Sequence, residues 1–253
     1  MNFGFQSIGG ATFVLTIGDL KIACDPVLCS RGTIVDFFWF KSRRVESPVY
    51  QETTFREVDL WLITHNHEDH LDDTGLSVIG EHSTVICNKN SSLKLAERGL
   101  TDLTVLDWGE WKNTTMKGCR IEIEAIPAVH GISPLSAFFA GKGNGYCLTI
   151  TKGEEHIRIY ITGDTVYRKR IIRAIGNRAI DLMIANMGAA KAGSWIMTLT
   201  LDAKMLQKMI SALQPKMVIP VHYGTFEHYK EPVEEIEKLQ DRRIKLAKNL
   251  NES

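Results

Sequence analysis

The segment that most constrains this chain is a cluster of polar side chains directly after an apolar run. Residues 64–72 read Thr-His-Asn-His-Glu-Asp-His-Leu-Asp and follow the apolar residues 60–63. His65, His67, Asp69 and His70 therefore lie within six positions. Three imidazoles and a carboxylate so close together cannot all lie on one face of a helix or a strand. The segment is predicted to be a loop at the end of a strand.

The donor atoms of this cluster indicate a metal site. Neutral imidazole nitrogens and carboxylate oxygens are the ligands that borderline and harder divalent metal ions take in proteins. The spacing allows two sets of ligands that point at two neighbouring ions. Glu68 lies inside the cluster, but its side chain is expected to point away from the site, toward solvent.

Three further candidate ligands each end an apolar stretch. A glycine or another small residue follows each of them within two positions. They are His130, Asp164 and His222. A glycine after such a residue lets the backbone turn close to the ligand. A single histidine at a strand end is more often structural, but the cluster needs partners to complete two coordination shells. The remaining histidines are expected to be ordinary surface or loop residues: His82, His156 and His228.

Composition narrows the class of protein. A length of 253 residues predicts a single domain, 1–253, with a substantial core. Thirty basic and thirty acidic residues cancel, which argues against a nucleic-acid partner and favours a small-molecule substrate. Five scattered cysteines and the lack of an export signal in the first residues fit a reducing cytoplasm. No apolar stretch approaches roughly 20 residues, so stable membrane insertion is not expected; homo-oligomerisation stays open.

Apolar, β-branched runs separated by Gly, Asp and Pro predict strands in the first half, with a helix at 91–98. The second half is predicted to contain strands at 146–151, 157–162, 181–186 and 217–221 and helices at 167–175, 201–213 and 232–249. Strands early and helices later in each half favour an α/β fold with two sheet layers and helices outside, an α/β/β/α four-layer sandwich. The long segment 30–56, with aromatic residues at 37–40, is interpreted as a functional loop, a hydrophobic flap or a dimer contact.

The order HxHxDH, then His, Asp and His, resembles the metallo-β-lactamase fold superfamily over essentially the whole chain. The resemblance implies that His65, His67 and His130 hold one metal ion. It also implies that a second ion is held by Asp69, His70 and His222, with Asp164 as the bridge between the two ions.

Other segments are similar to the lactonase-like metal-dependent hydrolases that include L-ascorbate-6-phosphate lactonase. These segments are residues 8–13, Asp25-Pro26, 162–165, Met197-Thr198 and 220–223. Gly10 stands where many of those relatives carry a histidine, and the sugar-phosphate contacts of the lactonase cannot be matched, so the resemblance does not transfer the substrate.

The expected cofactors are two divalent metal ions, zinc or manganese. Two ions about 3.5–4 Å apart can share a water, lower its pKa and present hydroxide to a carbonyl or a phosphorus atom. Asp69 is the candidate catalytic residue, because it can orient the hydroxide and carry a proton to the leaving group; a ligand-only role is the alternative. Asp72 either accepts a hydrogen bond from a metal-bound imidazole or caps the next turn.

The sequence therefore favours a metallohydrolase that acts on a small metabolite, first a lactone or a phosphorylated cyclic ester. A diiron oxidoreductase of this superfamily usually has a glutamate where this chain has His67, which favours hydrolysis. The alternatives are a phosphodiesterase of phospholipid or cyclic-nucleotide type, for which residues 37–40 suggest an apolar opening, and a non-catalytic metal-stabilised binding protein. Candidates for substrate contact are Arg31, Lys191, Trp195 and Tyr223.

Overall fold

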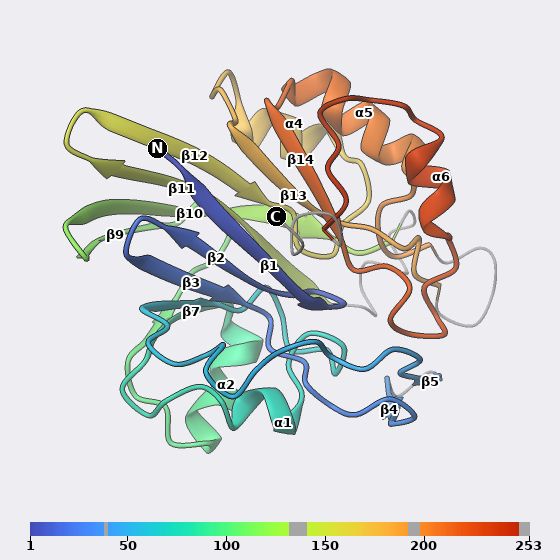
Figure 1. Cartoon of the computed structure of the whole chain (residues 1–253), viewed down its shortest axis with the longest axis horizontal. Coiled ribbons are helices and arrows are strands. Elements are labelled where there is room, and N and C mark those ends of the chain that lie inside the picture. Colours follow the sequence, from blue (N-terminus) through green and yellow to red (C-terminus); the bar gives the residue numbers. More distant parts are fainter. Residues whose placement is uncertain (38–39, 132–140, 192–197, 248–253) are drawn as a thin grey trace.

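Two mixed β-sheets pack face to face in this protein (Figure 1). The computed structural model describes residues 1–37, 40–131, 141–191 and 198–247. Within these residues the first sheet has the order β1-β2-β3-β6-β7-β8. Its strands are β1 (Phe3–Gly9), β2 (Thr12–Ile17), β3 (Leu20–Cys24), β6 (Leu60–Leu62), β7 (Thr84–Cys87) and β8 (Leu103–Val105).

The second sheet has the order β14-β13-β12-β11-β10-β9. Its strands are β9 (Trp111–Met116), β10 (Cys119–Val129), β11 (Lys142–Lys152), β12 (Glu155–Ile161), β13 (Leu182–Asn186) and β14 (Met217–Val221). Pairing is antiparallel from β9 to β12 and parallel from β12 to β14. Consequently β10, β12, β13 and β14 all run in the same direction, and their carboxyl ends meet at one edge of the sheet.

Helices cover the outer face of each sheet, so the predicted α/β/β/α sandwich is confirmed (Figure 1). Beside the first sheet lie α1 (Asp73–Leu76) and α2 (Lys89–Glu97). Beside the second lie α4 (Lys169–Ile175), α5 (Ala203–Leu213) and α6 (Val233–Glu237). Among the described residues no helix is both long and apolar enough to cross a membrane.

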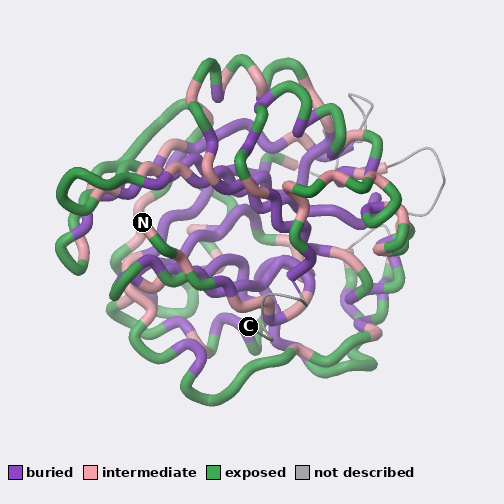
Figure 2. Tube along the Cα trace, turned by 45° about the horizontal axis from the view of Figure 1, so that its top comes forward, coloured by how far each residue is buried: buried purple, intermediate pink, exposed green. Residues whose placement is uncertain are grey.

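The main core lies between the two sheets, where Figure 2 shows the backbone as buried. Strand β10 illustrates why the sequence folds this way. Its residues Ile121 and Ile123 point into the core, while Arg120 and Glu122, which alternate with them, are exposed. This alternation with a period of two is what a strand with one buried face requires.

Two predicted elements differ from the observed structure. The helix predicted over 232–249 is wrong for residues 238–247, because Gln240 takes a left-handed conformation with φ +48° and the chain then runs beside β14; residues 248–249 lie outside the described part. There Ile244 forms a parallel bridge with Val218, and the Lys245 amide donates to the Val218 carbonyl at 2.8 Å. The segment 30–56 contains an unpredicted hairpin of β4 (Ile34–Asp36) and β5 (Lys41–Arg43); residues 38–39 lie outside the described part.

Two buried tyrosines on the second sheet differ in how their hydroxyls are satisfied. The Tyr146 hydroxyl donates a 2.7 Å hydrogen bond to the Ile63 carbonyl in the other sheet layer. The Tyr160 hydroxyl is equally buried, but it has no hydrogen-bond partner among the described residues. An unsatisfied buried polar group lowers stability by about 1–3 kcal/mol, so Tyr160 is a site where the native residue is not the most stable one.

Replacing Tyr160 by Phe is expected to raise the free energy of unfolding by about 1 kcal/mol, since the change removes an unsatisfied hydroxyl and little volume. Tyr146→Phe is the matched control and is expected to lower it by about 1 kcal/mol, because the Ile63 carbonyl loses its donor. Urea denaturation of both variants measures these changes. A Tyr160→Phe protein less stable than the parent would contradict the assignment.

Candidate metal centre

All seven predicted ligand residues come together at one edge of the sandwich. As predicted, the histidine-rich cluster is a loop after a strand, β6. The three other residues follow the parallel-running strands of the second sheet, with His130 after β10, Asp164 after β12 and His222 after β14. The geometry separates the seven into two groups, each with residues from both sheets.

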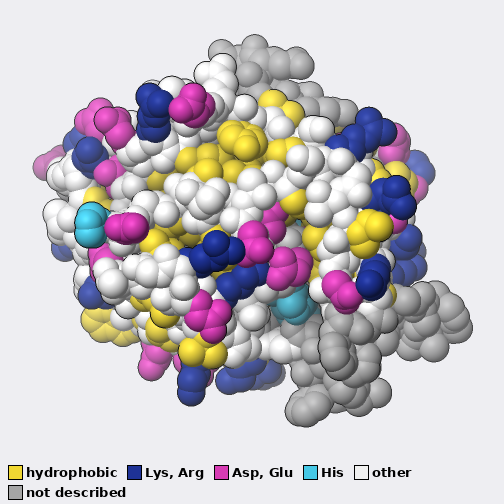
Figure 3. Space-filling view, turned by 90° about the horizontal axis from the view of Figure 1, so that it is seen from below, with side chains coloured by type: hydrophobic (Ala, Val, Ile, Leu, Met, Phe, Trp, Pro, Cys, Tyr) yellow, Lys and Arg dark blue, Asp and Glu magenta, His cyan; other side chains and the backbone are white. Residues whose placement is uncertain are grey.

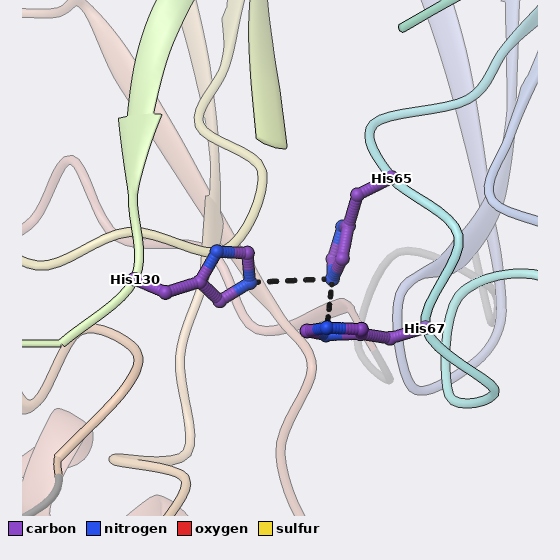
Figure 4. A group of neighbouring side chains, drawn as sticks. All are labelled: His65, His67 and His130. Atoms are coloured by element: carbon purple, nitrogen blue, oxygen red, sulfur yellow. Dashed lines mark hydrogen bonds between the residues drawn. The ribbon is translucent and has the colours of Figure 1, made fainter. Parts of the chain in front are cut away.

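The first group contains His65, His67 and His130 (Figure 4). The Nε2 atom of His65 lies 3.0 Å from Nδ1 of His67 and 3.3 Å from Nε2 of His130. Ligands bound tetrahedrally at 2.0–2.1 Å lie about 3.3 Å from one another, so these ring nitrogens are spaced as they would be around one ion. His65 and His130 are buried, whereas His67 is partly exposed.

The second group contains Asp69, His70, Asp164 and His222. The Nε2 atoms of His70 and His222 face each other at 3.0 Å. Each ring has an acceptor at its other nitrogen: Asp25 Oδ2 lies 2.7 Å from Nδ1 of His70, and the Met187 carbonyl lies 3.1 Å from Nδ1 of His222. Because each Nδ1–H is used in this way, both Nε2 atoms present lone pairs. Two opposed lone pairs need a proton or a metal ion between them.

Asp164 lies between the two groups. Its Oδ1 atom is 3.1 Å from Nε2 of His70, and its Oδ2 atom is 3.9 Å from Nε2 of His130. The side-chain amide of Asn186 donates to Oδ1 at 3.0 Å and fixes the orientation of the carboxylate. Each carboxylate oxygen therefore faces one group.

The protonation states in this centre suit a cation. Burial lowers the pKa of His65, and it lowers the pKa of His130 to about 3, so both rings are neutral. Burial alone would raise the pKa of Asp69 and Asp164, but the neighbouring histidines outweigh it and hold both pKa values well below their usual range. Neutral imidazoles and ionised carboxylates are the forms that bind metal ions.

His70 is the exception. Burial alone would lower its pKa, but the carboxylates of Asp164 and Asp25 outweigh burial and raise the pKa well above its usual value. Below this raised pKa, Nε2 of His70 carries a proton that faces both Nε2 of His222 and Oδ1 of Asp164. The His/Asp cluster is able to bind metal, and a metal ion would displace this proton.

Asp25 organises the second group from behind. Its carboxylate accepts hydrogen bonds from the Thr64 amide at 2.7 Å and the Thr64 hydroxyl at 2.6 Å, besides its contact with His70. From the sequence, this imidazole-supporting role was one of two predicted for Asp72. The alternative holds instead: Asp72 caps α1 and accepts from the Leu28 and Cys29 amides. The position of Asp25 directly after β3 was the available signal.

Two residues near Asp69 were missed or misjudged. His228, expected to be an ordinary surface or loop residue, is buried, and its Nε2 atom lies 3.1 Å from Oδ2 of Asp69. The hydroxyl of Tyr229 donates to the same oxygen at 3.1 Å. Neither follows an apolar strand directly, so no local signal identifies them. Glu68 points away from the centre, as predicted, and pairs with Lys94 at 2.8 Å.

Phe37 and Phe40, at the tip of the β4–β5 hairpin, border the exposed side of the centre. The rings of Phe37 and Phe40 stack with centroids 4.7 Å apart. Phe37 contacts His228 with a centroid distance of 5.0 Å and approaches the edge of His67 at 6.1 Å. An apolar surface therefore lies beside His67, the one predicted ligand that is partly exposed.

The remaining candidates for substrate contact lie in different places. Tyr223 lines a cavity of about 520 Å³ together with Gly9, Gly10 and Thr225. The Lys191 amide donates to the His228 carbonyl at 3.1 Å, so this segment runs beside the centre. Arg31 is exposed. Trp195 lies outside the described residues, as does Met197 of the lactonase-like segments.

Fold and centre together define a metallo-β-lactamase-type protein. Residues 21–223 match the profile of the beta-lactamase superfamily domain, and the chain belongs to this family.

Several curated proteins are similar to the chain. An N-acyl-phosphatidylethanolamine-hydrolyzing phospholipase D 1 from Caenorhabditis elegans is 24% identical over 93% of this chain and 69% of its own length. A UPF0173 metal-dependent hydrolase from Pyrococcus furiosus is 27% identical over 76% of this chain and 79% of its own.

Solved structures share the fold. One, described as a possible metal-dependent hydrolase from Veillonella parvula, has a TM-score of 0.81 and 21% identity, covering 96% of this chain and 95% of its own. An isothiocyanate hydrolase from Delia radicum gut bacteria has a TM-score of 0.76 and 20% identity, with the same coverage.

Metal binding is expected to depend on pH differently in the two groups. Below the raised pKa of His70, a metal ion in the second group must displace a proton, so its affinity falls by about tenfold for each pH unit of acidification. The first group stays neutral through the same range, so its affinity changes little. Calorimetric zinc titrations in buffers of different ionisation enthalpy count the released protons. Equal proton release from both binding steps would contradict this assignment.

Asp25→Asn is expected to weaken metal binding to the second group by about 10- to 100-fold, the usual effect of losing a carboxylate that supports a metal-bound imidazole. Binding to the first group is expected to be unchanged. Competition with a chromophoric chelator measures both affinities. Asp19→Asn is the matched control, because Asp19 is an exposed carboxylate whose one ion pair among the described residues is with Lys152 at 3.7 Å. Identical affinities in the two variants would show that Asp25 does not support the ligand.

Proposed function

We propose that this protein is a metal-dependent hydrolase with a dinuclear centre. The observation that carries the proposal is the presence of two convergent ligand groups with Asp164 between them. The UPF0173 relatives, named as metal-dependent hydrolases, support the hydrolytic class. His65, His67 and His130 would hold one ion, Asp69, His70 and His222 the other, and Asp164 both.

Two bound ions of zinc or manganese would supply a water of lowered pKa and polarise the substrate oxygen. The protein's own side chains would orient the attacking water and transfer its proton. The ionised Asp69 has a buried Oδ1 atom with no partner among the described residues, so this oxygen is available to accept a hydrogen bond from the attacking water. The same oxygen can then carry the proton to the leaving group.

The substrate class proposed first is a small lactone or a phosphorylated cyclic ester. It rests on the similarity of residues 8–13, Asp25-Pro26, 162–165 and 220–223 to lactonase-like hydrolases. Asp25 has a structural reason to be part of that pattern, because it supports His70. On the face shown in Figure 3, basic and acidic side chains are interspersed, so this face offers no large basic patch to a polyanion.

A phosphodiesterase with an apolar substrate is the second candidate. Phe37 and Phe40 place an apolar surface beside the partly exposed His67, where a hydrophobic leaving group or chain would lie. The similarity to the phospholipase D 1 from Caenorhabditis elegans favours the same chemistry. Both candidates use the same centre and differ in the substrate that its open side accepts.

The two candidates are separated by a substrate panel on protein reconstituted separately with zinc and with manganese. Turnover of lactones or cyclic esters would support the first candidate, and turnover of phosphodiesters the second. Esters and thioesters complete the panel. A metal-loaded protein that is inactive on all four classes but binds a metabolite would contradict the proposal and support a binding protein.

Replacing Asp164 or His67 by Ala is expected to lower bound metal and to reduce hydrolysis by more than about 100-fold, since these are direct ligands rather than their outer partners. Both variants are expected to keep the fold, as judged by circular dichroism. The exposed His156→Ala is the control and is expected to keep full metal content and activity. Full activity in Asp164→Ala would rule out the dinuclear centre.

A further inference from the structure

The two oxygens of Asp69 have very different surroundings. Oδ2 lies 3.1 Å from Nε2 of His228, 3.1 Å from the Tyr229 hydroxyl and 3.4 Å from Nε2 of His222. Oδ1 is buried and has no hydrogen-bond partner among the described residues. The hydrogen bonds that fix the carboxylate are therefore both made to Oδ2. Its 3.4 Å separation from the His222 nitrogen is the spacing of two ligands of one ion, so Oδ2 is also the oxygen that would bind metal.

Ser42 and Asp69, one at each ring nitrogen, fix the tautomer of His228. The Ser42 Oγ atom accepts a 3.3 Å hydrogen bond from the His228 amide and lies 2.8 Å from Nδ1 of the same ring. Because the ionised Asp69 carboxylate can only accept, Nε2 of His228 carries the ring hydrogen, and Nδ1 accepts from the Ser42 hydroxyl. His228 is thus held as a donor toward Asp69.

The residues around Asp69 are themselves fixed to the fold. Ser42 lies in β5, and the neighbouring Arg43 carbonyl accepts from the Glu227 amide at 3.0 Å. Arg44 forms a bridge with Phe226 one step further on. The segment that carries His228 and Tyr229 is therefore attached to the β4–β5 hairpin by backbone pairing. Phe37 and Phe40 pack on the His228 ring and keep water from it.

We propose that Ser42, His228 and Tyr229 are positioning residues that clamp Oδ2 of Asp69, so that Oδ1 alone faces the reacting water. This inference rests on the proposed hydrolytic function of the centre. The clamp prevents the carboxylate from rotating, which would exchange the two oxygens. Groups that orient a catalytic carboxylate in this way raise the rate without contacting the substrate.

The clamp is tested in the full chain with single-atom and side-chain changes: Ser42→Ala, His228→Ala, His228→Gln and Tyr229→Phe. His228→Ala and Tyr229→Phe are expected to lower kcat by about 10- to 100-fold with little change in KM. His228→Gln, which keeps an N–H donor at this position, is expected to recover most of the loss. In the double variant His228→Ala/Tyr229→Phe, the fold-decrease in kcat is expected to be smaller than the product of the two single decreases, because both donors hold the same oxygen.

A second measurement separates this proposal from the proposed function. In cobalt-loaded protein, the electronic absorption spectrum reports on the coordination of each ion without a substrate. The spectrum is expected to change in His228→Ala and Tyr229→Phe, and to remain as in the parent in the controls Tyr160→Phe and His156→Ala. If no substrate is hydrolysed by the parent, the proposed function fails, and the spectra still decide whether the clamp exists.

Three results would overturn the clamp. The first is a parental spectrum and kcat in His228→Ala and Tyr229→Phe. The second is an equal loss in His228→Gln and His228→Ala, which would show that the ring acts by packing alone. The third is a change in KM with unchanged kcat, which would make these residues part of the substrate pocket. Because Tyr229→Phe and Ser42→Ala remove one oxygen each, they keep the test valid if His228→Ala does not fold.

Discussion

The common direction of β10, β12 and β14 is the constraint on which the rest of the structure depends. It brings His130, Asp164 and His222 to one edge of the second sheet, opposite the loop that follows β6 in the first. The loop is held there by the second sheet: the Asn144 amide donates to the Thr64 carbonyl at 2.8 Å, and Tyr146 donates to Ile63. Once the strands of the two sheets are aligned at this edge, the positions of the ligand residues are set.

Burying the carboxylates at this edge would be energetically unfavourable without the neighbouring histidines. Two buried carboxylates, Asp69 and Asp164, are taken out of water at a large free-energy penalty, and their neighbours offset it. Asp25 adds a third buried carboxylate that is satisfied by Thr64 and His70. The cluster thus has an excess of negative charge that a proton on His70 partly balances, and divalent ions would balance it better.

The fold and the seven candidate ligands could be predicted because their signals are local. Four ligands lie in the loop after the apolar strand β6, and the other three each follow an apolar strand of their own. The alternation of buried and exposed residues, as in β10, marks the strands themselves. Residues defined by long-range contacts could not be predicted. His228 can be buried because its ring forms hydrogen bonds with Ser42, 186 positions away, and with Asp69. The last predicted helix was wrong for a related reason: pairing with β14 overrides the helical charge pattern after Gln240.

Each ligand group draws on both layers of the sandwich, with His65 and His67 from the first sheet and His130 from the second. The same is true of the group that joins Asp69 and His70 to His222. A metal ion in either group would therefore cross-link the two sheets, as a disulfide joins distant parts of a chain. With ions bound, the centre would also join the two halves of the fold, and the sheets would separate at this edge only after the ions had dissociated.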